Sequence, residues 1–146
     1  MSTQTGTPPI SVLVDGRKEG GEVKFGHKWK AASGSWKSGD IVVESGTPEH
    51  EIIFEVDPAS AKKLRFVDDP HDAIWIGTSA CPKKAANEGG QITPIAVEAN
   101  GTRLRVANAN KGEPSELHYA LRFKRKIPIL FKPHKYDPVI KNGGGG

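Results

Sequence analysis

The sequence predicts an all-β protein, an antiparallel β-sandwich of about seven strands. Its 146 residues include 17 glycines and 11 prolines, and only 36% of them are hydrophobic. This composition is typical of short strands joined by many turns, and it does not favour long helices. Apolar and polar residues alternate with period two in several segments. Turn residues separate most of these segments at intervals of about 8–12 residues.

The strands predicted in the first half of the chain are residues 10–14, 22–30, 41–44 and 51–56. The segment 22–30 alternates regularly, with Phe25 and Trp29 on one face and lysines on the other. A strand of this kind buries one face and exposes the other to water. One or two helical turns are expected after the last of these strands, because Asp57 can cap a helix that begins at Pro58.

The strands predicted in the second half are residues 64–67, 73–77, 92–97, 103–106 and 117–123. The pair Asn100-Gly101 is the strongest hairpin signal in the chain. The last strand alternates cleanly, which places four large side chains on one face. The predicted core consists of Val12, Val14, Phe25, Ile53 or Phe54, Ile74, Ile76, Leu104, Val106, Tyr119, Leu121 and Phe123.

These patterns divide the chain into three regions. Residues 1–9 form a mobile N-terminal lead, residues 10–123 form the β-sandwich domain, and residues 124–146 form an irregular basic extension that contains proline and glycine. In outline, the succession of strands resembles immunoglobulin-like or cupredoxin-like sandwiches. The resemblance is one of pattern alone, because the Cys…Trp…Cys signature of antibody domains is missing. A five-stranded barrel is the competing architecture.

The sequence also bears on location. No apolar run approaches the ~18 residues needed to span a bilayer, so no membrane insertion is expected. The first nine residues have neither the basic nor the apolar region of a secretory signal. The single cysteine, Cys81, cannot form an internal disulfide. One thiol and no signal favour a cytoplasmic location.

Cys81 is one candidate for chemistry. A blue-copper site needs a histidine close to the cysteine and usually a methionine ligand. Cys81 is instead followed by Pro82 and two lysines, and the only methionine is Met1. A thiol-dependent enzyme at Cys81 is an alternative, because helical amides after Pro82 and the adjacent lysines would favour the thiolate. Since the sequence has no second cysteine to resolve an oxidised thiol, we expect an ordinary loop cysteine.

The segment Asp68-Asp69-Pro70-His71-Asp72 places three carboxylates and an imidazole within five residues. Calcium loops space their oxygen ligands at alternate positions and use a glycine for the sharp turn. This segment has neither feature, and a proline-containing turn opened by aspartate explains its composition. Catalytic and nucleotide-binding motifs are also missing from the sequence. We therefore predict no catalytic residue, no metal and no cofactor.

Positive charge is concentrated at the C-terminal end of the chain. Residues 117–146 carry seven basic side chains and one acidic one, whereas the first 116 residues carry 14 basic and 16 acidic ones. The same end contains the apolar run 127–131, interrupted by Pro128 and bracketed by lysines. Exposed apolar residues in a row are typical of a segment that docks on a protein surface. The residues expected to make contact are Lys124, Arg125, Lys126, Ile129, Leu130, Phe131, Tyr136 and Ile140.

These observations predict a non-enzymatic protein-interaction or structural module, in a homo-oligomer or a larger assembly, that docks through its C-terminal extension. A nucleic-acid-binding β domain is the alternative, with tryptophans stacked on bases. Its basic face would consist of Arg103, Arg105, Arg122, Lys124, Arg125 and Lys126. Residues 143–146 are all glycine and fit a flexible linker. They fit a ubiquitin-like tail less well, because such modifiers carry a central helix that this pattern lacks.

Overall fold

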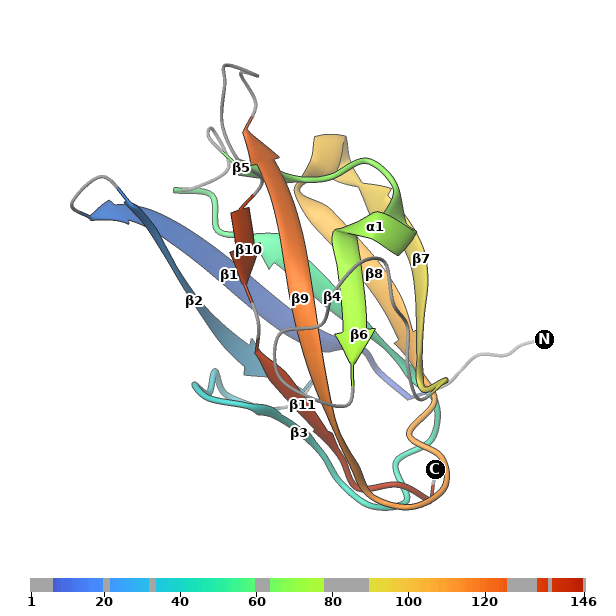
Figure 1. Cartoon of the computed structure of the whole chain (residues 1–146). Helices are drawn as coiled ribbons and strands as arrows, with labels where there is room; N and C mark the ends of the chain where they lie inside the picture. The colour runs from blue at the N-terminus through green and yellow to red at the C-terminus, as the bar shows by residue number, and fades with distance from the viewer. Residues whose placement is uncertain are drawn as a thin grey trace.

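A computed structural model of the chain describes residues 7–19, 22–31, 34–59, 64–77, 90–125, 134–136 and 138–145. Two β-sheets pack against each other, which confirms the predicted all-β sandwich (Figure 1). The described residues form eleven strands, more than the seven or so expected. The number is higher mainly because two of the strand positions in the second sheet are each occupied by two short strands.

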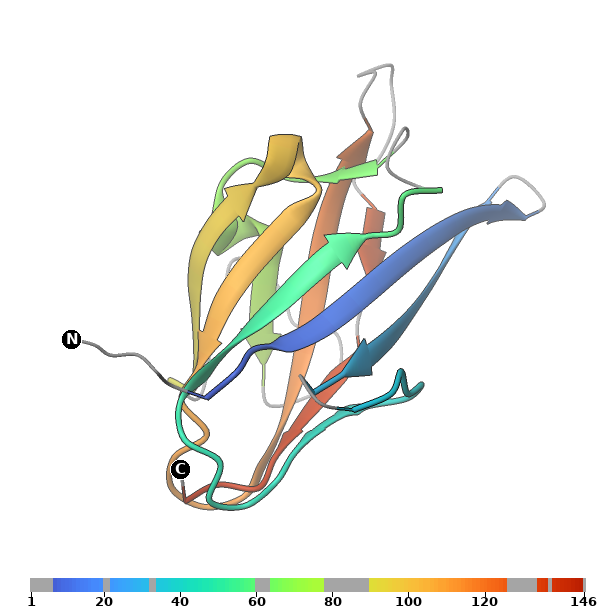
Figure 2. The ribbon, with the colours of Figure 1, turned by 180° about the vertical axis from the view of Figure 1, so that it is seen from behind.

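The first sheet has the strand order β2-β1-β4-β8-β7 (Figure 2). Its strands are β1 (Ile10–Glu19), β2 (Glu22–Lys30), β4 (His50–Val56), β7 (Ile92–Glu98) and β8 (Arg103–Asn108). The predicted hairpin joins β7 and β8 through the 3₁₀ turn η2 (Ala99–Gly101), where Asn100 has a φ of 58° and Gly101 a φ of 88°. β1 and β4 run parallel, so the sheet is mixed and not purely antiparallel.

The second sheet is built around β9 (Ser115–Arg125). Its other strands are β3 (Ile41–Val43), β5 (Leu64–Phe66), β6 (Ile74–Gly77), β10 (His134–Tyr136) and β11 (Val139–Asn142). β5 and β6 pair with one edge of β9, and β10 and β11 pair with the other edge. The chain leaves the sheet between β5 and β6 to form the single-turn helix α1 (Pro70–Ala73). β3 is the last strand of this sheet and runs parallel to β11.

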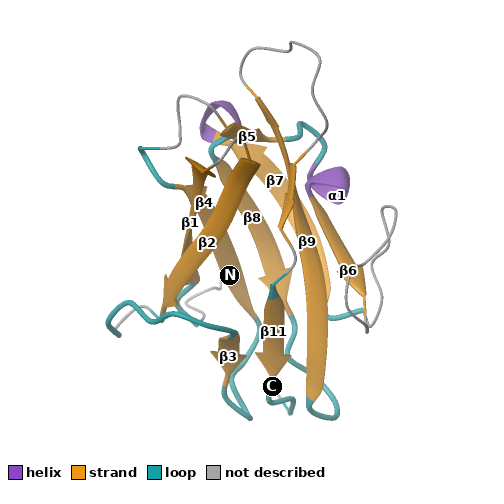
Figure 3. Cartoon of the chain, turned by 60° about the vertical axis from the view of Figure 1, so that its left-hand side comes forward, coloured by secondary structure: helices purple, strands orange, loops and turns teal. Residues whose placement is uncertain are grey.

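Figure 3 shows the two sheets facing each other. The core lies between them and is formed by alternate side chains of the strands. The four inward side chains predicted in β9, Leu117, Tyr119, Leu121 and Phe123, are at most 1% exposed. The rings of Phe66 and Phe25 both stack on Phe123, with centroids 4.9 and 5.2 Å away. Phe25 is only partly buried, and Phe54 rather than Ile53 points inward. The other predicted core residues are buried.

The described part of the C-terminal segment corrects the prediction of an irregular extension that begins at residue 124. β9 continues to Arg125. β10 and β11 follow one antiparallel register along β9, with His134 opposite Phe123 and Val139 opposite His118. The described residues of this segment therefore complete the second sheet. Each strand is too short to display a period in the sequence, and both depend on β9 for their pairing.

Candidate functional site

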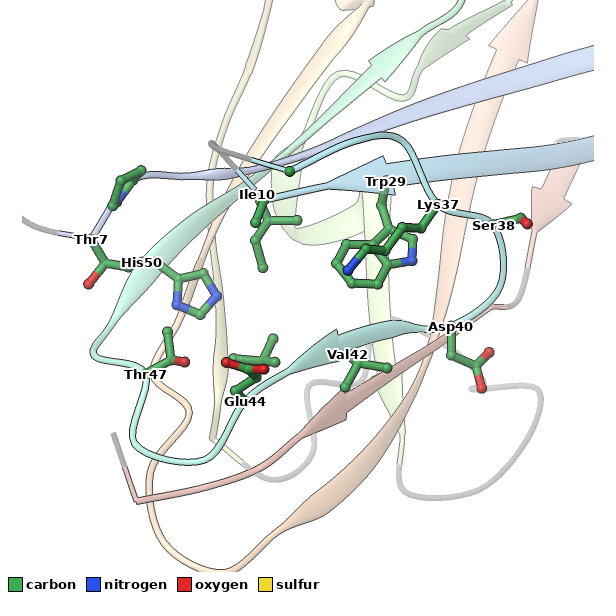
Figure 4. A pocket seen from close by; sticks show the side chains of 14 residues that line it. Thr7, Ile10, Trp29, Lys37, Ser38, Asp40, Val42, Glu44, Thr47 and His50 are labelled. Carbon is green, nitrogen blue, oxygen red and sulfur yellow. The ribbon is translucent and has the colours of Figure 1, made fainter.

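A cleft of about 640 Å³ opens between the two sheets on the side where β2 and β3 lie (Figure 4). β2 and β3 are the terminal strands of their sheets in the described structure. The start of β1 and the end of β2 form one wall, and β3 with the turn after it forms the other. The lining residues are Thr7, Pro8, Ile10, Trp29, Ala31, Gly34, Lys37, Ser38, Asp40, Val42, Val43, Glu44, Thr47 and His50.

Trp29 lies in the wall formed by the first sheet, and its ring faces the cleft in Figure 4. Only 5% of Trp29 is exposed, yet its indole Nε1–H has no hydrogen-bond partner among the residues that the structure describes. The backbone of Trp29 is bridged to Lys37 by two hydrogen bonds of 2.8 and 2.7 Å. This bridge holds the Lys37 ammonium group 5.2 Å from the Trp29 ring centroid. The cleft wall therefore contains a buried donor beside a cation.

The opposite wall is an open strand edge. The Gly143 N–H donates to the Val43 carbonyl (2.7 Å), so the backbone N–H and C=O groups of the first and third residues of β3 point toward β11. In a parallel ladder, the residue between them directs its N–H and C=O to the other side. That residue is Val42, whose side chain is 50% exposed. In the described part of the chain, no strand pairs with this edge.

A buried asparagine holds the turn that ends this wall. The Asn110 amide donates to the carbonyls of Glu44 and Thr47, at 3.2 and 3.0 Å. The Asn110 side-chain oxygen accepts from the Gly144 N–H at 2.8 Å, and the Gly46 N–H donates to the Gly144 carbonyl at 2.8 Å. Asn110 is fully buried. The turn that carries Glu44 and Thr47 is thus fixed by both the β8–β9 loop and the C-terminal glycines.

The glycines at positions 143–145 are an ordered part of this structure. A Cβ on Gly143 would lie 2.8 Å from the Ser45 Cα, and one on Gly144 would lie 2.9 Å from the Glu113 carbonyl carbon. Gly144 also has a φ of 79°, which L-residues rarely adopt. In this structure these residues hold the cleft turn through their contacts with Val43, Gly46 and Asn110.

His50 closes one end of the cleft and belongs to a buried polar network. Its Nδ1 lies 2.9 Å from the Pro48 carbonyl, and its Nε2 lies 3.3 Å from the Asn108 side-chain nitrogen. The carbonyl can only accept, which assigns the proton to Nδ1 and leaves Nε2 as the acceptor. Asn108 and Asn142 exchange two amide hydrogen bonds of 2.9 and 2.8 Å. Both ring nitrogens of His50 are therefore engaged by the protein itself.

A lysine–tryptophan cluster, defined here as Lys28, Lys30, Trp36 and Lys37, lies on β2 and the segment after it, and only Lys37 of its members lines the cleft. Trp36 is 42% exposed. The ammonium groups of Lys28 and Lys30 lie 5.4 and 4.9 Å from its ring centroid. Within the described ranges, no carboxylate forms an ion pair with any of the three lysines. Two of the lysines thus surround the exposed indole of Trp36, and none of the three is neutralised by a carboxylate that the structure describes.

The structure distributes the residues predicted to contact a partner over different environments. Lys124 forms an ion pair with Asp68 at 2.6 Å. Arg125 and Tyr136 lie in β9 and β10. Ile140 is fully buried in the core, so it contacts the chain's own sandwich and is not available to a partner. The remaining predicted contacts, Lys126, Ile129, Leu130 and Phe131, lie outside the described residues.

The basic face expected for the nucleic-acid alternative is not continuous. Arg103 and Arg105 are on β8 of the first sheet, whereas Arg122 is on β9 of the second. Carboxylates also neutralise these side chains. Arg103 pairs with Glu55 at 3.2 Å, and Arg122 pairs with Asp72 at 2.5 Å. Among the described residues, Lys28, Lys30 and Lys37 form no such ion pair.

The acidic segment 68–72 forms a capped helical turn in place of the β-turn predicted for it. Asp69 caps α1 by accepting from the His71 N–H at 2.9 Å. Asp72 accepts from Arg122 and from the Trp75 indole N–H, the latter at 3.2 Å. Among the described residues, no group of three potential ligands is placed to hold a metal ion. Cys81 lies outside the described residues.

The chain matches no protein-family model, and comparison with curated proteins finds no significant relative. No helix in the described ranges is long and apolar enough to cross a membrane. The sequence does not reveal the cleft, because the alternation within 22–30 places Trp29 on the buried face of its strand and the lysines on the exposed face. The available signal was the clustering of three lysines and two tryptophans within residues 28–37.

Proposed function

We propose that this protein is a non-enzymatic binding module that holds an extended segment of a protein partner in the cleft between β2 and β3. The observation that carries the proposal is the Trp29 indole N–H, which is buried without an acceptor among the described residues. Leaving a buried donor unsatisfied costs about 1–3 kcal/mol. A carbonyl oxygen of a bound segment would supply the missing acceptor.

The open edge of β3 favours an extended polypeptide as the occupant. Extended segments bind by adding to an exposed strand edge, where main-chain hydrogen bonds supply affinity. Val42 directs its backbone N–H and C=O toward the cleft side and exposes half of its side chain. Ile10 and Trp29 provide an apolar wall across from it. Donors on both walls and apolar surface between them match an extended chain with alternating side chains.

The polar groups of the cleft support binding rather than turnover. A general acid or base must present a nitrogen or oxygen to the reacting group. His50 is the imidazole of the cleft lining, and both of its nitrogens are already engaged by Pro48 and Asn108. In this proposal the C-terminal segment contributes indirectly, because β11 and the glycines hold the cleft wall.

The proposal is tested by selecting a phage-displayed random octapeptide library on the immobilised protein. We expect selected peptides to lose about tenfold in affinity for Trp29→Phe, which keeps the aromatic body and removes the N–H, because one hydrogen bond contributes about 1.4 kcal/mol. Val42→Pro should weaken them as well, since it removes the edge donor without removing a ladder bond. Trp75→Phe is the matched control and should leave binding unchanged, because its N–H already bonds to Asp72.

Two outcomes would contradict the proposal. One is a library that yields no specific peptide. The other is a set of peptides that bind the Trp29→Phe and Val42→Pro variants as tightly as the original chain, provided that circular dichroism shows the variants folded. In an assembly, the segment in the cleft can come from another copy of the chain. Sedimentation velocity would then detect an oligomer, and adding a selected peptide would dissociate it.

A further inference from the structure

The outer face of the first sheet carries positive charge at its β2 edge. Residues 17–37 contain six basic and two acidic side chains, an excess as large as the net +4 of the whole chain. Lys28 and Lys30 alternate with the buried Trp29, so their side chains leave β2 on the face turned away from the core. This edge therefore presents two ammonium groups that no described carboxylate neutralises.

Trp36 joins these two lysines because of the backbone bridge between Trp29 and Lys37. The bridge is antiparallel and places Lys37 opposite Trp29. The residue before Lys37 then lies on the other face, beside Lys30. The ammonium groups of Lys28 and Lys30 are 5.4 and 4.9 Å from the Trp36 ring centroid, and Trp36 is still 42% exposed. We call these three residues, Lys28, Lys30 and Trp36, the β2 outer patch.

The patch is narrow, because the arginines further along the same sheet are neutralised. Arg103 and Arg105 of β8 form ion pairs of 3.2–3.7 Å with carboxylates of the neighbouring strands. β1 and β4 separate these pairs from the patch, and the residue opposite Lys30 on β1 is the uncharged Ser11. Among the described residues of this face, the positive charge without an ion-pair partner therefore lies along one strand, which favours a single anionic chain over a broad acidic surface.

An exposed indole between two cations favours single-stranded nucleic acid among anionic chains. Each nucleotide joins a phosphate to a base, and a base that is not paired in a duplex can stack on an aromatic ring. Residues two apart in a strand are about 7 Å apart, a spacing comparable with that of successive phosphates in an extended single strand. A lipid surface would engage several apolar side chains, but the other exposed large apolar residues of the described chain, Val42 and Ile95, belong to β3 and β7.

We infer that the β2 outer patch binds single-stranded nucleic acid, with one base stacked on Trp36 and the adjacent phosphates held by Lys28 and Lys30. This inference goes beyond the proposed function and does not depend on it. None of the three residues lines the cleft, and the two lysines leave β2 on the face opposite Trp29. The protein then has two binding surfaces that can be occupied at the same time.

Fluorescence anisotropy of a labelled twelve-nucleotide oligothymidylate tests the inference, at sodium chloride concentrations from about 50 to 200 mM. On a single strand, each phosphate contact contributes about 0.7 to the slope of log affinity against log salt concentration. The double variant Lys28→Gln, Lys30→Gln should therefore bind more weakly and reduce the slope by about 1.4. Lys111→Gln is the matched control, because Lys111 is exposed in the β8–β9 loop, and it should change neither quantity.

Trp36→Leu separates stacking from charge. It removes the ring and keeps an apolar side chain, so the affinity should fall about tenfold while the salt slope stays that of the original chain. On the duplex with oligoadenylate the same variant should make no difference, because the bases are already stacked on one another. The cleft variants Trp29→Phe and Val42→Pro should bind the oligothymidylate as tightly as the original chain does, and a saturating selected octapeptide should not displace it.

The inference is overturned if the oligothymidylate does not bind the original chain at about 50 mM salt, or binds the double lysine variant with an unchanged affinity and slope. A glutamate peptide of the same net charge that binds as tightly, and loses as much affinity with Trp36→Leu, would assign the patch to an acidic protein. Phosphatidylserine vesicles that displace the oligothymidylate would assign it to an anionic lipid surface. Both results would also overturn the inference, and all of these outcomes leave the proposed cleft function standing.

Discussion

Replacing Gly144 by alanine should destabilise the fold, because this residue is built into the cleft wall. A Cβ at this position would overlap the Gly112 carbonyl oxygen and approach the Glu113 carbonyl carbon to 2.9 Å. The tail would have to leave its place. It would then lose the 2.8 Å bonds to Asn110 and Gly46, at about 1 kcal/mol each, and leave the buried Asn110 oxygen without that donor. We expect the free energy of unfolding to fall by about 2–4 kcal/mol.

Urea unfolding followed by tryptophan fluorescence measures this change, with Gly39→Ala as the matched control. Gly39 also has a positive φ, 89°, but a Cβ there meets no described atom within 4 Å. The control should therefore cost only the conformational penalty of about 1–2 kcal/mol. Equal losses for the two variants, or a Gly144→Ala variant within 1 kcal/mol of the original chain, would refute the account of the glycines. Binding of a selected peptide should weaken in Gly144→Ala as well, because the turn at Glu44 loses its support.

Three further predictions concern the rest of the molecule. Leu121→Ala should cost about 2–5 kcal/mol in the same unfolding assay, because Leu121 is fully buried; a loss below about 1 kcal/mol would contradict the strand register. Asn108→Leu should lower the free energy of unfolding by about 1–3 kcal/mol, because it leaves the buried Asn142 amide without its hydrogen-bond partner. Adding Asn142→Leu should recover part of that loss in a double-mutant cycle. Cys81→Ser should keep the stability and the selected peptides of the original chain, and loss of peptide binding would contradict the prediction that Cys81 is dispensable.

The parts of the fold that sequence predicted correctly are those with a local periodic signal. The inward face of β9 follows from strict alternation over 117–123, because side chains of a strand alternate between its two faces. The β7–β8 hairpin follows from Asn100-Gly101, since these residues adopt positive φ at low cost. Trp29 was also placed correctly on a buried face. In each case neighbouring residues in the chain contain the information.

The parts that sequence reasoning missed depend on contacts between distant segments. β10 and β11 are three and four residues long, too short to show a period, and they pair with the distant strand β9, and β11 also with β3. The parallel pairing of β3 with β11 joins residues about one hundred positions apart. The cleft exists because β2 and β3 end different sheets, and the roles of Asn110 and Gly144 follow from that arrangement. No local pattern in the sequence encodes these pairings.

The Trp29 indole N–H can be observed directly, and its behaviour tests the central claim. The chain has three tryptophans, so a ¹H–¹⁵N correlation spectrum contains three indole resonances, which single Trp→Phe variants assign. Titration with the tightest selected octapeptide should shift the Trp29 resonance downfield as the N–H gains an acceptor, while the Trp75 resonance stays in place. A Trp29 resonance that does not move when the peptide is fully bound would contradict the account.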